Sequence, residues 1–186
     1  MLSFLKRKVS GTEIGAEFFK RLRDGHAAGF AEDREFFPVE AQISRDAVID
    51  EWLYFEVFLV DYSTYLALGR TSEKSKVLDL FWLSIQEWLG AHQVVALPER
   101  LAVLGGGPRS IPPEKVEYAL ARLLRRMKTY CSAIQTPHRL GENYSVASVF
   151  LNSCGNFNAI TVTGISTLFS SRKIGYVELL KSVRIV

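Results

Sequence analysis

The sequence lacks the features that would assign it quickly to several large classes of protein. It contains 2 Cys and 3 His among 186 residues, and these do not have the spacing of a zinc site or of a disulfide framework. The glycine triplet at 105–107 is not followed by the lysine of a phosphate-binding loop. No catalytic motif is found. These absences favour a non-enzymatic protein without deciding the question, and they identify no cofactor.

The sequence also lacks a long hydrophobic run, and we expect no secretory signal in it. The most apolar stretch, DEWLYFEVFLV at residues 50–60, is interrupted by acidic residues, whereas a membrane span needs about 20 mostly apolar residues. In MLSFLKRK the basic residues follow the apolar ones, which is the reverse of a signal peptide. This stretch would make only a very short membrane-surface anchor. We therefore expect no transmembrane span and a cytoplasmic location with free thiols.

The composition is that of one ordinary globular domain. Apolar residues make up 48% of the chain and charged residues 23%, and a chain of this length can close its own core. We therefore expect a single helical domain over residues 1–186. The only stretch that reads as a flexible connector lies near residues 102–112, around GGGPR.

Hydrophobic periodicity predicts an all-α fold, a mainly antiparallel bundle of about six or seven helices. The second and third helices should form an antiparallel pair because the loop between them is short. Thr12 is the expected N-terminal cap of the first helix. The β-branched sequence AITVTGIST leaves an α+β fold open, with a strand at 159–169. The expected helices cover residues 11–30, 44–68, 73–92, 113–135, 143–153, 158–169 and 174–184.

Glu56 is the most informative polar residue of the second helix. At 100° per residue it falls among Trp52, Leu53 and Leu59, inside the apolar stripe. The other acids of this helix fall towards the opposite side, together with Tyr54. Glu56 is therefore predicted to be buried, and a buried carboxylate needs a hydrogen-bonding partner.

Two hypotheses of ligand binding follow from the helical phases. Glu56, His92 and His26 lie on three helices and could together hold iron or zinc. No Glu-x-x-His spacing supports this metal site, and a Glu56 satisfied by Tyr, Trp, Arg or His is the favoured interpretation. The second hypothesis is a small-molecule pocket lined by Trp52, Trp82 and Trp88.

Charge is distributed unevenly along the chain. Residues 1–118 carry 14 Lys and Arg against 18 Asp and Glu, and residues 119–186 carry nine against two. Halves of opposite sign are expected to pack on each other or on a second copy. The basic face of helix 113–135 is an alternative candidate for binding nucleic acid, although a face that is solvated or meets the acidic half is favoured. This face comprises Arg122, Arg125, Arg126 and Lys128.

The 29 residues from Asn143 to Ser171 contain no charged residue. A surface helix normally carries charge on its outer side, so this segment is either enclosed by the fold or covered by another protein. We expect a mixture of the two, with a homodimer as the first hypothesis. By default, the absence of any catalytic motif favours function through protein–protein contacts or self-association over ligand binding and nucleic-acid binding. The predicted interface consists of Val149, Phe150, Ile160, Ile165, Leu168 and Phe169.

Overall fold

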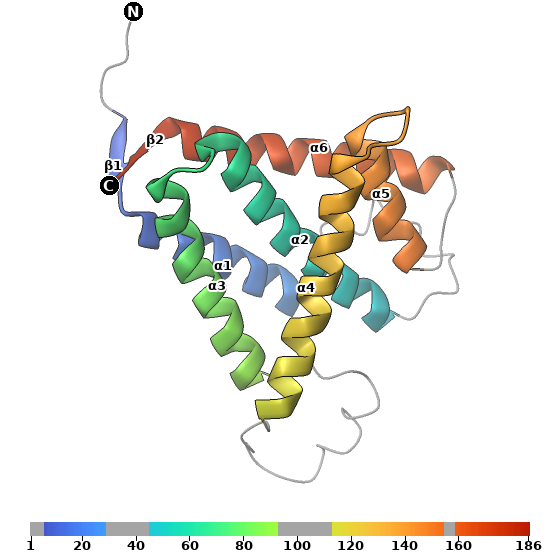
Figure 1. Ribbon diagram of the computed structural model, residues 1–186, viewed down its shortest axis with the longest axis horizontal. Helices are drawn as coiled ribbons and strands as arrows, with labels where there is room; N and C mark the ends of the chain where they lie inside the picture. Colours follow the sequence, from blue (N-terminus) through green and yellow to red (C-terminus); the bar gives the residue numbers. More distant parts are fainter. Residues whose placement is uncertain (1–5, 29–44, 93–112, 155–158) are drawn as a thin grey trace, which may run out of the picture.

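A computed structural model describes residues 6–28, 45–92, 113–154 and 159–186. Within these ranges the chain forms six helices and one pair of three-residue strands, which confirms the all-α bundle (Figure 1). The connector predicted near residues 102–112 lies outside the described residues. The elements are β1 (Arg7–Val9), α1 (Gly11–Ala27), α2 (Arg45–Leu68), α3 (Ser72–His92), α4 (Pro113–Gln135), α5 (Glu142–Ser153), α6 (Ala159–Ser182) and β2 (Val183–Ile185).

Helix α2 is the centre of the bundle. It packs against all five other helices, and every residue from 51 to 60 is buried. A helix that is covered on all sides has no solvent face for periodicity to reveal. This corrects the placement of the other acids and Tyr54 on an outer side, because Glu51 is 5% exposed and Tyr54 is 3% exposed.

Helix α3 packs more extensively against α1 than against α2. The expected pairing of α2 with α3 is limited, because the helices diverge from the turn at residues 69–71 (Figure 1). Two glycines permit the closer contact with α1. A Cβ on Gly11 would lie 2.5 Å from the Lys76 Cβ, and one on Gly15 would lie 2.4 Å from the Val77 carbonyl oxygen.

The N-terminal cap of α1 lies two residues before the expected one. Ser10, not Thr12, is the cap residue, and its side chain accepts a hydrogen bond from the Thr12 amide. The Glu13 side chain in turn accepts a hydrogen bond from the Ser10 amide at 3.0 Å. The S-x-x-E spacing of residues 10–13 is the sequence signature of this capping box.

Residues 159–182 form one continuous helix, α6, which crosses α2 and α5 at the top of Figure 1. The alternative strand at 159–169 is therefore wrong, and so is the expected break between two helices at 169–174. Packing decides the conformation here, since Val162, Ile165 and Phe169 are buried at helical spacing. No helix within the described ranges combines the length and apolar character that crossing a bilayer requires.

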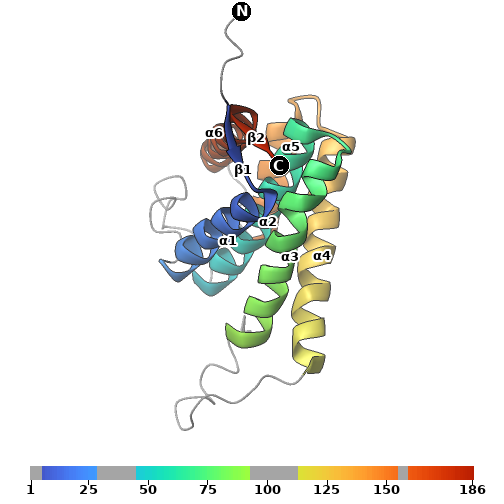
Figure 2. The same cartoon turned by 90° about the vertical axis from the view of Figure 1, so that its left-hand side faces the viewer.

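Strands β1 and β2 bring two distant segments of the chain together. They pair in parallel, with Arg7 opposite Val183, Lys8 opposite Arg184 and Val9 opposite Ile185. The ladder lies at the end of α6 in both views (Figures 1 and 2). Val9 and Ile185 pack on the core, so the ladder also closes the end of the bundle. Strands of three residues are too short to have been predicted from the sequence.

Candidate functional site

Two carboxylates of the central helix α2 are almost fully buried, and each forms an ion pair. Glu51 pairs with Arg126 of α4, and Glu56 pairs with Arg172 of α6. Both acids come from the acidic first part of the sequence and both arginines come from the basic second part. The charge asymmetry is therefore explained in part by contacts between the two halves of a single chain.

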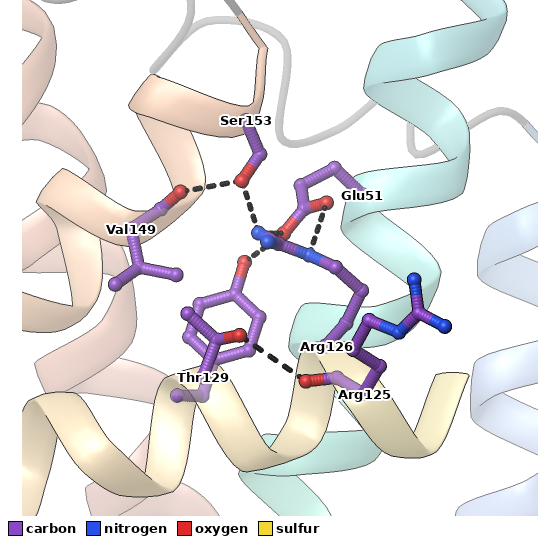
Figure 3. A network of polar contacts seen from close by, with 7 residues as sticks. Glu51, Arg125, Arg126, Thr129, Val149 and Ser153 are labelled. Carbon is purple, nitrogen blue, oxygen red and sulfur yellow. Dashed lines mark hydrogen bonds and ion pairs between the residues drawn. The ribbon is translucent and has the colours of Figure 1, made fainter. Parts of the chain in front are cut away.

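The Glu51 network joins three helices (Figure 3). Arg126 donates to both carboxylate oxygens, from Nε to Oε2 at 3.1 Å and from Nη2 to Oε1 at 2.6 Å. Tyr130, one turn later on α4, donates to Oε1 at 2.5 Å. Arg126 also donates to Ser153 at the end of α5, whose hydroxyl donates to the Val149 carbonyl. The bidentate geometry fixes both the distance and the rotation of α4 relative to α2.

Burial sets the direction of the pKa shift for Glu51, Tyr130 and Cys154, but not for Arg126. It raises the pKa of Glu51, and the hydrogen bonds from Arg126 and Tyr130 oppose that rise only in part. Burial would lower the pKa of Arg126, but the contacts with Glu51 and Tyr130 together outweigh burial, and the pKa is raised. The pKa of Tyr130 is raised well above its ordinary value by burial and by the Glu51 charge. Burial also raises the pKa of the neighbouring Cys154 thiol to about 12, which favours the protonated, less reactive form.

The prediction that Glu56 is buried and hydrogen-bonded is confirmed. Its side chain is 4% exposed, and Arg172 donates to one of its carboxylate oxygens. Tyr176, one turn further along α6, donates to the other oxygen at 3.2 Å. Burial and the negative charge of Glu56 raise the pKa of Tyr176. The phenol therefore stays protonated and remains a donor.

A third, less buried ion pair joins α5 to α6. Lys173 donates to Glu142 and to the Asn143 side-chain oxygen, and Tyr62 of α2 donates to Glu142 at 2.8 Å. Burial would raise the pKa of Glu142, but the contacts with Lys173 and Tyr62 outweigh it, and the pKa is lowered. Arg172 and Lys173 are thus both turned inward from α6.

The residues of the proposed metal site have other neighbours. Glu56 is engaged by Arg172 and Tyr176, and the His26 ring packs edge-on against Trp88 with centroids 5.0 Å apart. The His92 side chain lies outside the described part of the structure. No group of three His, Cys, Asp or Glu suited to a metal occurs among the described side chains.

The tryptophans proposed to line a small-molecule pocket pack in separate surroundings. Trp52 contacts Phe55 and Phe150 in the core. Trp88 packs against Phe19 of α1 as well as His26. The half-buried Trp82 contacts Phe81 and hydrogen-bonds to Asp61 of α2. Each of the three rings therefore packs against different side chains.

The basic face of α4 is divided by the fold. Arg126 is drawn into the Glu51 network, and Arg122 lies 3.7 Å from Asp50 and over the Tyr54 ring. Arg125 and Lys128 remain exposed. Two of the four predicted basic residues are thus committed to contacts within the chain, which favours the interpretation that this face meets the acidic half.

The uncharged segment is divided in a similar way, and this corrects the predicted interface. Four residues of the predicted interface lie in the core of the single chain and cannot reach a partner. They are Phe150, Ile165, Leu168 and Phe169, which are 0 to 6% exposed. Val149 is half-buried. Ile160 is 82% exposed and is the one fully accessible member of the set.

The ion pairs position helices, and their donors and acceptors are occupied by one another. Replacing a buried ion pair by apolar residues is often neutral for stability, so such pairs are better suited to fixing one helix arrangement than to adding stability. The sequence revealed Glu56 through its phase but not the Glu51 network. The opposite charges of the two halves were the available indication that such pairs exist.

Comparison of the chain with protein-family models, curated proteins and solved structures found no match.

Proposed function

We propose that this protein acts through protein–protein contact, by self-association along the outer face of α6. The observation that carries the proposal is the absence of charge on that face from residue 160 to residue 175. We define the α6 outer face as Ile160, Thr163, Thr167, Ser171, Ile174 and Gly175, all of which are exposed. These positions fall within about 120° of the helix circumference at 100° per residue.

On α6 the charged residues face inward and apolar residues face outward, which is the reverse of the usual pattern of a surface helix. Arg172 and Lys173, the charged residues of this stretch, turn inward to Glu56 and Glu142. Two isoleucines face outward instead, with Ile160 82% and Ile174 50% exposed. The next charge on the outer face is Glu178. Apolar surface freed from water would favour association at this face.

A second copy of the chain is the partner that fits this surface. In a two-fold dimer each patch meets its own copy, so a charged patch would oppose like charges. A neutral face avoids that repulsion. The small residues Ser171 and Gly175 would let two helices approach closely, and a Cβ on Gly175 would meet nothing within 4 Å in the single chain.

The expected association is weak and reversible. The outer face spans 15 residues of rise, or about 22 Å, and a helix is about 10 Å wide. The resulting area of roughly 220 Å² is well below the ~800 Å² per partner of a standard interface. The dimer should therefore form at micromolar or higher protein concentration, with adjoining surfaces of α5 adding to the contact.

Sedimentation velocity over a concentration series tests the proposal. We expect the wild-type protein to shift from monomer towards dimer as concentration rises, and Ile160→Lys with Ile174→Lys to remain monomeric. Leu140→Lys is the matched control, because Leu140 is 62% exposed outside α6. A wild type that is monomeric at every concentration would contradict the proposal. So would double-Lys and control variants that associate equally.

A further inference from the structure

The β1–β2 ladder gathers basic side chains that are far apart in the sequence. Lys8 lies opposite Arg184 in the register of the two strands, and neighbouring strands are about 4.8 Å apart. Like charges placed directly opposite each other destabilise a strand pair. The fold nevertheless holds these two cations opposite each other. An anionic partner would relieve the repulsion between them.

Further cations surround this pair. We define the terminal basic patch as Lys6, Arg7, Lys8, Lys181 and Arg184, all of which are exposed. None of the five forms an ion pair with a carboxylate in the described part of the chain. The nearby Glu13 accepts from the Ser10 amide in the cap of α1, and Glu178 lies about one turn before Lys181 on α6.

We propose that the terminal basic patch docks the protein on a membrane surface containing anionic lipids. Clusters of four to eight Lys and Arg are typical of such contacts. The patch reaches this number with five exposed cations, two of which the ladder holds opposite each other.

A nucleic-acid partner fits this patch less well. Single-stranded nucleic acids are held by aromatic side chains that stack on bases, between the basic residues. The strands RKV and VRI contain no aromatic residue. The patch begins beyond the C-terminal end of the α6 outer face and is centred on the β1–β2 ladder, with Lys181 as its member on α6. Variants at Lys8 and Arg184 therefore test membrane docking without changing a residue of the α6 outer face.

Co-sedimentation with vesicles tests the inference. We expect the full chain to bind vesicles of phosphatidylcholine with phosphatidylserine, not vesicles of phosphatidylcholine alone, and to dissociate as salt is raised. Each cation near an anionic surface contributes about fivefold to partitioning, so Lys8→Gln with Arg184→Gln should weaken binding roughly 25-fold. The matched control is Arg125→Gln with Lys128→Gln, which removes two exposed cations from α4.

The inference is overturned if the wild type fails to bind anionic vesicles at low salt, or if both double variants lose affinity equally. Tighter binding to single-stranded RNA than to vesicles would also overturn it. Far-UV circular dichroism and thermal melting of each variant show whether the ladder variant keeps its fold. Should that variant unfold, Lys6→Gln with Lys181→Gln tests the same patch without changing a paired strand residue, and its affinity must then fall below that of the α4 control.

Discussion

Glu56 offers the sharpest test of the buried ion pairs. Glu56→Leu would leave Arg172 without its carboxylate and the Tyr176 hydroxyl without its acceptor. Breaking a buried ion pair by removing one partner costs about 3 to 5 kcal/mol. The Arg172 side chain is 28% exposed and can turn partly towards water. We therefore expect the lower end of this range, about 3 kcal/mol of lost unfolding free energy.

Two further variants separate the contributions to that loss. Glu56→Gln keeps the shape of the side chain and an acceptor for Tyr176, so it should cost only about 1 to 2 kcal/mol. Combining Glu56→Leu with Arg172→Met removes both charges, and the double variant should be no less stable than Glu56→Leu alone. Such non-additivity is the expected property of residues in contact.

Urea unfolding followed by circular dichroism measures these losses, provided that the slope with denaturant is unchanged. Glu17→Leu is the control, since Glu17 forms an exposed pair with Arg21 on α1 and should cost less than about 0.5 kcal/mol. A Glu56→Leu loss equal to that of the control would refute the reasoning. A double variant much less stable than Glu56→Leu would refute the assignment of Arg172 as the partner.

The remaining predictions concern close packing, pH and thiol reactivity. Gly15→Ala should destabilise the protein by about 1 to 3 kcal/mol in urea because its Cβ meets the α3 backbone, whereas Gly175→Ala should be neutral or stabilising. The lowered pKa of Glu142 means that its stabilising effect is present above pH 4.5 and lost as pH falls through the folded-state pKa. Glu142→Gln should therefore flatten the acid side of the stability–pH curve, and an unchanged curve would contradict this. With Ellman's reagent, the half-buried Cys131 should react before Cys154, which should react only on unfolding; the reverse order would contradict the burial of Cys154.

The sequence predicted the helices better than it predicted their surroundings. Periodicity located the ends of α2, α3 and α5 to within one or two residues. Each of these helices begins or ends beside a residue whose own conformational preference starts or stops a helix. Gly69, with a φ of 65°, follows α2 in this way. The phase of Glu56 was also informative. The same reasoning failed for Glu51, because a helix covered on all sides buries whichever polar residues it carries.

The rest of the site depends on contacts between residues far apart in the sequence. Arg126 lies 75 positions from Glu51, and Arg172 lies 116 positions from Glu56. Helical phase says which way a side chain points but not which helix receives it. The charge difference between the two halves indicated that partners existed without naming the pairs. The inward turn of Arg172 and Lys173, which leaves the α6 outer face uncharged, could not have been read from the sequence.

Disulfide cross-linking at Thr167 tests self-association through α6 most directly. Thr167 is exposed at the midpoint between Ile160 and Ile174, so a two-fold contact centred on this face brings it near its own copy. We predict that Thr167→Cys forms a covalent dimer under mild oxidation much faster than Ser75→Cys does. Ser75 is an exposed position on α3. The wild type, with its two native thiols, is the blank. Equal rates for the two variants, or no dimer beyond that of the wild type, would contradict the proposed function.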